Sequence, residues 1–427
     1  MNVAVTGLGA TTPLGGDVPS TWSALLAGEP GVSPLEEGWA ETLPVRMAAR
    51  LRVEPAEVLD RVQARRLDRC EQIALIAARE AWADAGCPPV DPERLAVAIG
   101  TGTGGVLTLL GQDDVLERSG ARQVSPRAVT MLMTNGPAAV VSLELGARGG
   151  AHTPVSACAS GAEAIALGLD LIRLGRADVV VAGGAEACIH PLVLAGFAQA
   201  TAHSTRNDDP AGASRPFDAT RDGFVIGEGA AMVVLERAEF ATARAVTAYA
   251  ALAGAGITSD AHHMTAGHAD GQARAIRRAL TDARLGGHDI DLVHAHATAT
   301  PHGDLTEAQA ISDAVGRHAA VTATKSMTGH LFGAAGSLNA VAAILALHHQ
   351  IAPPTINLRE QDPRIKLDVV TGGPRTGRFG AALANSFGFG GHNACLVFQS
   401  DNRDGGDRNL SPRQGRHALP STRRGRP

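Results

Sequence analysis

The chain has 427 residues, of which 44% are hydrophobic and 19% are charged, and its formal net charge is -5. This composition is that of a globular protein with a large buried core, and the length suggests two or three domains. A mildly acidic chain without a broad basic surface is not expected to bind nucleic acid. The five cysteines have no paired spacing, so neither a zinc module nor a disulfide framework is indicated, and a reducing cytosol fits best.

The N-terminus shows no targeting signal. Residues 1–7 resemble a first strand, because no basic region is followed by an apolar stretch as in a signal peptide. No apolar run approaches membrane-spanning length. We therefore expect a cytoplasmic protein with no membrane partner.

Short apolar strands alternate with alanine-rich helices, which predicts an α/β fold with helices packed over mostly parallel strands. The pattern restarts after about residue 245, where residues 248–256 play the part of the N-terminal strand. We predict two similar halves, 1–245 and 246–400, and a polar tail, 401–427, with too little apolar surface to fold. The predicted strands include 95–99, 178–182 and 291–295, and the predicted helices include 69–85 and 271–283.

Two glycine-rich stretches, 7–12 and 100–105, each follow a predicted strand and could be taken for dinucleotide-binding turns. The first has no third glycine and runs into Pro13. The second has no clear helix after it and no acidic residue at the distance of a ribose. A nucleotide-binding fold is therefore not favoured.

Cys158 lies between a strand and a predicted amphipathic helix, 163–174, which Gly175 ends. Unpaired N–H groups and the positive end of the helix dipole favour a thiolate at such a position, so we expect a lowered pKa and a usable nucleophile. A buried structural cysteine is the ordinary alternative. The small residues on both sides, Ala157 and 159–161, leave room for a substrate and favour the nucleophile.

Two candidate histidines, His296 and His330, follow Cys158 in the chain. Strand alternation places His294 and His296 on one side, so a metal pair is conceivable, but no third ligand has convincing spacing and a metal is not favoured. Thr298 and Thr300 would line the same cleft. His330 precedes a glycine-rich helix start, and the glycines of turn 385–393 permit close approach to a ligand.

Together these motifs resemble the β-ketoacyl synthases of the thiolase fold, the Cys-His-His enzymes that condense acyl chains on acyl carrier protein. The resemblance covers roughly residues 1–400, and the segments 204–210, 214–218 and 221–230 are similar to those of the elongating members. It implies an α/β thiolase fold in which two similar halves, each a five-stranded sheet between helices, stack as five layers. It also implies a dimer, as homodimer or heterodimer.

The resemblance further implies a two-stage reaction in which Cys158 takes an acyl group and malonyl carrier protein then supplies a carbanion. The backbone N–H groups of Cys158 and Phe389 would form the oxyanion hole, and His296 and His330 would stabilise the enolate left by decarboxylation. Lys325 would organise the histidines. No metal or redox cofactor is required, since the substrates travel on phosphopantetheine.

Other family roles fall on residues that would touch substrate or carrier protein. Thr298 and Thr300 match threonines that hydrogen-bond the phosphopantetheine arm, and Phe389 matches an aromatic gate over the acyl tunnel. Arg206 and a basic cluster are candidates for docking an acidic carrier protein, although a solvated helix face explains the cluster equally well. That cluster consists of Arg65, Arg66 and Arg69.

Three positions depart from the family pattern. Ala297 stands where glycine is usual, which would slightly crowd the turn after His296. Asn339 stands where many members have a glutamate that partners the lysine, so Lys325 is expected to be held less tightly. His392 replaces a frequent threonine, as in mycobacterial-type elongating synthases.

Related classes fit less well. A chain-length-factor subunit lacks the nucleophile, which Cys158 supplies here, although the chain could be the active subunit of such a heterodimer. A thiolase needs a second cysteine in the C-terminal turn, where this chain has Phe387 and Phe389. An initiating synthase has asparagine in place of His330. Neither the pathway, fatty acid or polyketide, nor the acyl chain length follows from the sequence.

Overall fold

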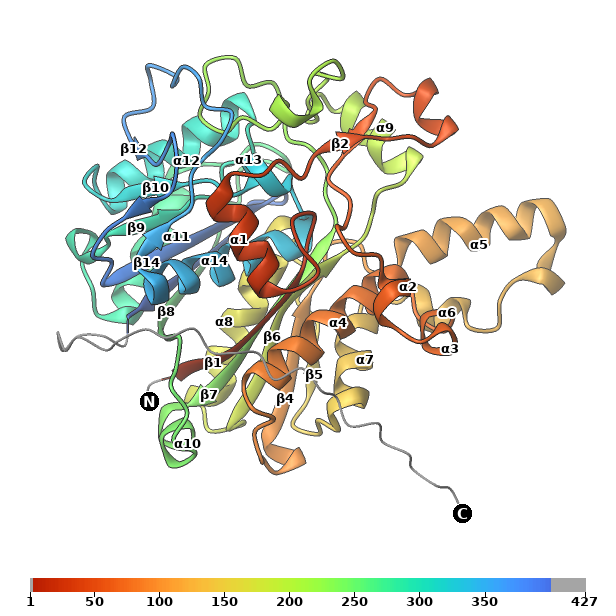
Figure 1. Cartoon of the computed structure of the whole chain (residues 1–427), viewed down its shortest axis with the longest axis horizontal. Helices are drawn as coiled ribbons and strands as arrows, with labels where there is room; N and C mark the ends of the chain where they lie inside the picture. Colours follow the sequence, from red (N-terminus) through yellow and green to blue (C-terminus); the bar gives the residue numbers. More distant parts are fainter. Residues whose placement is uncertain (1–2, 401–427) are drawn as a thin grey trace.

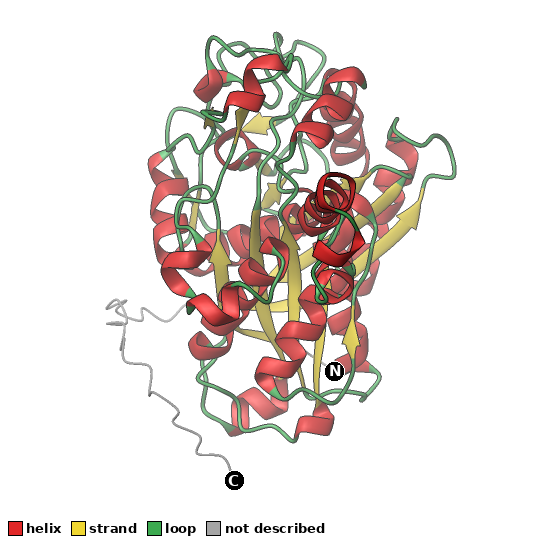
Figure 2. Cartoon of the chain, turned by 90° about the vertical axis from the view of Figure 1, so that its right-hand side faces the viewer, coloured by secondary structure: helices red, strands yellow, loops and turns green. Residues whose placement is uncertain are grey.

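The computed structural model describes residues 3–400, and the predicted tail 401–427 lies outside the described residues. A mixed sheet of 11 strands forms the framework (Figures 1 and 2). Its strand order is β12 (Asp368–Val369), β10 (Ala320–Thr322), β9 (Leu292–His294), β14 (Ala381–Gly388), β15 (His392–Gln399), β8 (Ala250–Ser259), β1 (Val3–Thr11), β7 (Gly229–Arg237), β6 (Val179–Glu186), β4 (Leu95–Gly100) and β5 (Ala151–His152).

The two halves meet where β1 pairs with β8, over Val3–Val5 and Ala250–Leu252. This short pairing joins two sheets, which we refer to as the N-terminal sheet (β1, β7, β6, β4, β5) and the C-terminal sheet (β8, β15, β14, β9, β10, β12). The predicted boundary between residues 245 and 246 falls between the short helix α10 (Ala238–Ala243) and β8, and the division into halves 1–245 and 246–400 stays a prediction.

Helices complete the five layers that the resemblance implied. One pair, α8 (Ser160–Arg173) and α14 (Ala335–His349), lies in the centre and contacts both sheets. Another pair, α4 (Arg69–Asp84) and α7 (Gly136–Leu145), covers the outer face of the N-terminal sheet. The corresponding outer helices of the C-terminal half are α11 (Ala269–Ala283) and α12 (Pro301–Ala314). The main hydrophobic core surrounds the central pair, and each outer pair has its own core.

The expectation of mostly parallel strands is wrong. Pairings β4–β6, β4–β5, β9–β14 and β9–β10 are parallel, but β1–β7, β6–β7, β8–β15 and β14–β15 are antiparallel. Strands buried on both faces are apolar throughout whatever their direction, as β6 is, so an apolar run does not report how a strand pairs.

Glycines explain how the first strand of each half meets its helix. A Cβ at Gly9 of β1 would lie 2.0 Å from the carbonyl oxygen of Ala77 in α4, and a Cβ at Gly256 of β8 would lie 2.1 Å from that of Ala275 in α11. Only glycine allows these backbones to approach so closely. The stretch 7–12 is therefore a packing surface, and the same device appears in both halves.

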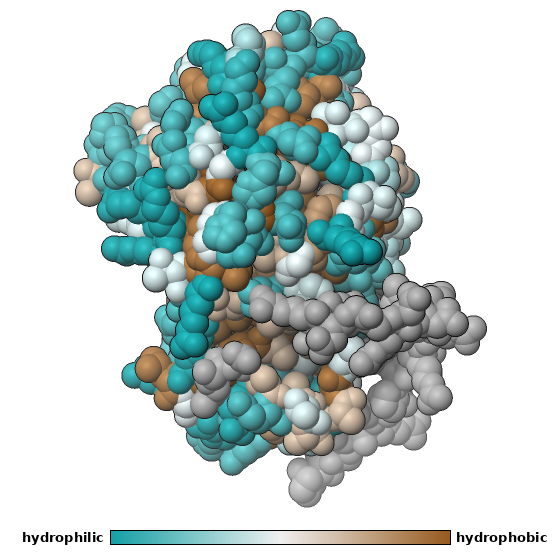
Figure 3. Space-filling model, turned by 90° about the vertical axis from the view of Figure 1, so that its left-hand side faces the viewer, coloured by the Kyte–Doolittle hydropathy of each residue, from teal (hydrophilic) through white to brown (hydrophobic). Residues whose placement is uncertain are grey.

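One stretch, Phe332–His349, is long and apolar enough to cross a membrane by length and composition, contrary to the expectation that no run approaches that length. It contains α14, and 89% of it is buried inside the protein. Here it serves as a core helix of the central layer. The side of the molecule drawn in Figure 3 is largely hydrophilic, with hydrophobic surface mainly in its recesses.

The remaining helices lie around this framework. The largest is α5, which projects from the N-terminal half in Figure 1. Their bounds are α1 (Val18–Ala27), α2 (Pro55–Val58), α3 (Arg61–Ala64), α5 (Val106–Ser119), α6 (Ala128–Leu132), α9 (Pro191–Gln199) and α13 (Lys325–Thr328).

Candidate active site

Cys158 lies in a tight turn at the start of the central helix α8. The turn is the 3-10 helix η4 (Ala157–Ala159), and its first residue, Ala157, has φ 52°, a left-handed conformation that alanine rarely adopts. The Ser160 hydroxyl closes the turn by accepting from Ser156 N and donating to the Ala157 carbonyl, at 2.9 and 2.7 Å. The thiol is 7% exposed.

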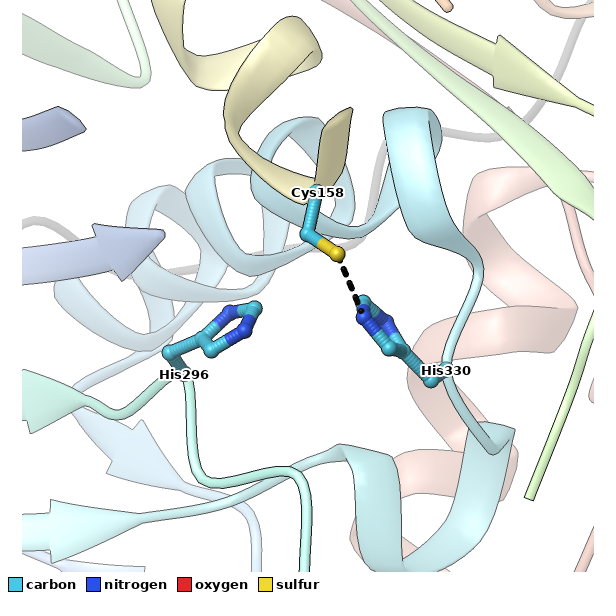
Figure 4. A group of neighbouring side chains, drawn as sticks. All are labelled: Cys158, His296 and His330. Atoms are coloured by element: carbon cyan, nitrogen blue, oxygen red, sulfur yellow. Dashed lines mark hydrogen bonds between the residues drawn. The ribbon is translucent and has the colours of Figure 1, made fainter. Parts of the chain in front are cut away.

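The structure brings Cys158 together with both predicted histidines (Figure 4). The Nε2 atom of His330 lies 3.0 Å from the Cys158 sulfur, and one ligand atom from each of the three residues lies within 4.8 Å of the others. The imidazoles of His296 and His330 meet edge to face, with centroids 5.3 Å apart. His296 follows β9 and His330 precedes α14, so the C-terminal half supplies both rings.

The expected lowering of the cysteine pKa is wrong. Burial raises the pKa of the Cys158 thiol to about 11, outweighing the charge of Lys325 and the backbone N–H groups of Phe389 and Cys158, which lower it. Backbone N–H groups at the helix start and at Phe389 do favour the thiolate, but the loss of water around a buried anion disfavours it more strongly. At neutral pH the group is therefore a thiol hydrogen-bonded to an imidazole.

Both histidines are neutral at neutral pH. Burial, with a smaller contribution from the charge of Lys325, holds the pKa of His296 and of His330 well below the ordinary value. Lys325 lies 3.4 Å from Nδ1 of His296 through its Nζ. Burial lowers the pKa of Lys325 to about 8, and the nearby carboxylate of Glu307 opposes this shift.

Two buried acids of α12 support the histidine loop, and the sequence analysis missed both. Glu307 accepts from the backbone N–H groups of His296 and Ala297 at 2.8 and 2.6 Å, and Asp304 accepts from that of Ala299 at 3.0 Å. Burial raises the pKa of both carboxyls, that of Asp304 to about 7. The two acids are three residues apart and closely follow Pro301, which starts the helix. This spacing was the signal that both lie on one face of α12, toward the preceding loop.

Asn339 hydrogen-bonds to the backbone and to Thr324, and a looser hold on Lys325 stays a prediction. Its Oδ1 accepts from the Thr324 hydroxyl at 3.0 Å, and its Nδ2 donates to the carbonyl oxygens of Ala295 and Asn385 at 3.0 and 3.2 Å. The amide therefore ties three backbone segments together. The negative charge that acts most strongly on Lys325 comes from Glu307.

His294 does not join the site. It is fully buried, burial lowers its pKa to about 3, and neither ring nitrogen has a hydrogen-bond partner among residues 3–400. Among the described residues, the group of neighbouring ligand atoms consists of Cys158, His296 and His330. His294 is not part of it, so the conceivable metal pair of His294 and His296 does not form there.

A cavity of about 580 Å³ reaches Cys158 and both site histidines. Its polar lining includes Thr298 and Thr300, whose hydroxyls lie 3.0 Å apart. Phe389 also lines it and is 39% exposed. The rest of the lining includes Thr265, Gln272 and Asn393 among polar residues and Cys188, Val193, Phe197, Phe224 and Phe332 among apolar ones.

The arginines are not one cluster. Arg65 and Arg66 are exposed, but Arg69 is bound by Glu54 and by the buried Glu228, each at 2.7 Å, and these partners raise its pKa despite burial. Arg69 is therefore an internal ion-pair residue, and its inclusion in a docking cluster is wrong. Arg206 lies in a separate loop before η5 (Pro210–Gly212) and is partly exposed.

Comparisons with known proteins agree on one family. The family models for the N-terminal and C-terminal domains of β-ketoacyl synthases match residues 1–241 and 249–359. The chain is 46% identical to 3-oxoacyl-[acyl-carrier-protein] synthase 2 of Mycobacterium bovis, over 93% of this chain and 96% of that protein. It is 42% identical to the protein of the same name from Synechocystis, over 93% and 97%.

Solved structures are similar as well. The ishigamide ketosynthase/chain length factor has a TM-score of 0.86 and 33% identity, covering 93% of this chain and 99% of that one. AntDE:AntF, a type II polyketide synthase acyl-carrier protein in complex with its ketosynthase, has a TM-score of 0.86 and 31% identity, covering 94% and 99%.

Proposed function

The chain belongs to the β-ketoacyl synthase family, and from this we propose that it catalyses the decarboxylative condensation of malonyl carrier protein with an acyl group held on Cys158. The observation that supports this most directly is the buried group of Cys158, His296 and His330 at one cavity, with ligand atoms within 4.8 Å.

In the first stage Cys158 attacks the thioester of an acyl carrier protein. Because the thiol is protonated at neutral pH, its proton passes to Nε2 of His330, 3.0 Å away, as the sulfur–carbon bond forms. The carrier thiolate leaves and takes this proton from His330, so atoms and charge balance and the imidazole is neutral again. The N–H groups of Cys158 and Phe389, already directed at the sulfur, would stabilise the tetrahedral oxyanion.

In the second stage malonyl carrier protein loses carbon dioxide and leaves an enolate. Neutral His296 and His330 would each donate one hydrogen bond to its oxygen, a contact that strengthens as charge develops; for His330 this uses the tautomer with the proton on Nε2, which no hydrogen bond at Nδ1 opposes. The carbanion then attacks the Cys158 thioester, forming the carbon–carbon bond and expelling the cysteine sulfur. Lys325 would act by positioning His296 and by its charge, and no metal or redox cofactor is needed for these steps.

The substrate arm would follow the polar lining. Thr298 and Thr300 present hydroxyls to the cavity, where amides of phosphopantetheine could bind them, and Phe389 stands at its exposed side. An acidic carrier protein would meet Arg65, Arg66 and Arg206 on the surface.

We further propose that the protein works as a dimer in the cytoplasm. Large exposed hydrophobic residues gather on α5, α6 and α7, next to the edge strand β5, as expected for a protein interface. They are Leu109, Leu116, Val129 and Leu143. The partner is a second copy or a related chain-length subunit, since one similar structure is a ketosynthase/chain length factor.

Intact-mass analysis tests the function. The purified protein is incubated with acyl carrier proteins bearing chains of different lengths, and carbon dioxide release from malonyl carrier protein is measured in parallel. We expect one acyl group per chain on wild type and none on Cys158→Ala. Absence of both acylation and carbon dioxide release from folded wild type would refute the proposal, and the chain-length profile indicates fatty acid or polyketide substrates.

A further inference from the structure

The imidazole of His330 packs against aromatic rings, and one of its two nitrogens lacks the hydrogen bond that usually orients such a ring. Its Nε2 faces Cys158, but its buried Nδ1 has no hydrogen-bond partner among the described residues. A working imidazole is normally held by the hydrogen bond of its second nitrogen. Here Phe332 stacks on the ring, with centroids 4.7 Å apart and planes at 25°, and Phe224 meets it edge to face at 5.5 Å and 84°.

Phe332 is itself held in an unfavourable backbone conformation. Its φ is 42°, in the left-handed region, which is unfavourable for a residue with a side chain and persists only where the surroundings enforce it. The next residue, Gly333, donates its N–H to the buried carboxylate of Glu186 at 3.0 Å. Glu186 also accepts from Gly102 N at 2.6 Å, so a fixed buried group anchors the turn.

We propose that Phe332 is a positioning residue that keeps the neutral imidazole of His330 aimed at the reacting atoms. Ring pairs of this kind contribute stabilisation beyond that of their buried area, so the stacked ring favours one orientation of the imidazole. Without the flat face of Phe332, the imidazole keeps only the edge contacts of Phe224 and His296 and the contact of its Nε2 with Cys158, because nothing binds Nδ1. The proposal rests on the proposed function, since it concerns the His330 that acts in decarboxylation.

Phe197 offers a matched control. It stacks on Phe332, with centroids 5.1 Å apart and planes at 22°, and it lines the same cavity. Phe197 contacts Phe224 as well, but among residues 3–400 its ring contacts do not include His330. Phe197→Leu therefore removes the same atoms from the same aromatic group without touching the imidazole.

The experiment measures carbon dioxide release from malonyl carrier protein over a range of substrate concentrations. Phe332→Leu is expected to lower kcat about tenfold or more while KM changes less than about twofold, because alignment is lost and binding is kept. Phe332→Tyr, which keeps the ring, should restore most of kcat. Phe197→Leu changes the cavity wall, so its effect should fall mainly on KM, and its loss of kcat should be clearly smaller than that of Phe332→Leu.

Thermal unfolding and near-ultraviolet circular dichroism confirm that each variant is folded. If Phe332→Leu does not fold, Phe332→Met, which fills similar space without a flat face, carries the same expectation. Equal losses of kcat in Phe332→Leu and Phe197→Leu, or a change confined to KM, would assign Phe332 to the cavity wall and overturn the inference. Wild type that releases no carbon dioxide would instead refute the proposed function.

Discussion

The turns that begin the two central helices are alike in backbone and differ in side chains. In the N-terminal half η4 (Ala157–Ala159) leads into α8, and in the C-terminal half η7 (Phe332–Ala334) leads into α14. The first residue of each turn has left-handed backbone, with φ 52° at Ala157 and 42° at Phe332. The second residue is Cys158 in one half and Gly333 in the other.

This difference shows how a duplicated framework divides the chemistry. A Cβ at Gly333 would lie 2.6 Å from the backbone nitrogen of Gly102 and 2.8 Å from a carboxylate oxygen of Glu186. The second turn has no space for a side chain at Gly333, the position that Cys158 has in the first turn. Its neighbour Phe332 contributes an aromatic ring, and the nucleophilic thiol is in the first turn only. The C-terminal half instead contributes His296 and His330 from the segments beside its turn.

The largest effect should come from removing the nucleophile of the first turn. Cys158→Ala is expected to abolish acyl transfer while the fold is kept, because the smaller side chain fits a turn already built from alanine. Cys158→Gln should block acylation yet keep or raise malonyl decarboxylation, since its amide can occupy the oxyanion hole. Intact mass and carbon dioxide release measure the two steps. Acylation of Cys158→Ala, or decarboxylation lost in Cys158→Gln, would contradict this division.

The histidines of the second half should separate by assay. His296→Ala is expected to cost about 2 to 4 kcal/mol in decarboxylation, the scale of one lost oxyanion donor, and little in acylation. His330→Ala should slow both, because a thiol whose pKa is about 11 needs the imidazole that lies 3.0 Å away. Burst acylation and carbon dioxide release give the two rates. Unchanged acylation in His330→Ala would show that the thiol ionises without it.

Filling the second turn tests whether its glycine is a steric requirement. Gly333→Ala is expected to destabilise the protein by about 1 to 3 kcal/mol, because backbone and a buried carboxylate, rather than a flexible side chain, surround the new methyl group. Gly111→Ala in α5 is the control, since no atom lies within 4 Å of its added Cβ, and it should stabilise by about 0.5 to 1 kcal/mol. Urea unfolding measures both. Equal stability of Gly333→Ala and wild type would contradict the steric argument.

Local sequence predicted the elements of this site better than its energetics. The helix predicted over 69–85 is α4, Arg69–Asp84, since its cap and apolar spacing are both local signals. Cys158 was placed correctly at a helix start. Its raised pKa was not foreseen, because it comes from burial among residues far along the chain, such as Phe224 and Phe332.

Distant partners also explain the other errors. Arg69 resembles a surface arginine in its local context, but its partner Glu228 lies 159 residues away. The pairing direction of β6 depends on which strands flank it in space, and no residue within an apolar strand records that. Glu307 showed its helical face in the sequence, but only the fold shows that this face meets the loop of His296.

The smallest effect concerns a second contrast between the halves. Counting β1 as the first strand of the N-terminal sheet, the fourth is β4, which is apolar. Counting β8 as the first strand of the C-terminal sheet, the fourth is β9, which ends in the buried His294. Burial lowers the folded-state pKa of His294 to about 3 from the ordinary value of 6.5, so between these values the unfolded chain binds more protons. Stability is therefore present above pH 6.5 and is lost as pH falls below it.

His294→Leu should remove that loss, because leucine fills an apolar position without an ionisable ring. We expect the free energy of unfolding of the variant to exceed that of wild type by about 1 to 2 kcal/mol more at pH 5 than at pH 7. Urea unfolding of both proteins at the two pH values measures this difference, and buried His203, which is present in both, cancels in the comparison. A difference that does not depend on pH would mean that His294 finds a proton-stabilising partner, and the contrast between β4 and β9 would then have no electrostatic consequence.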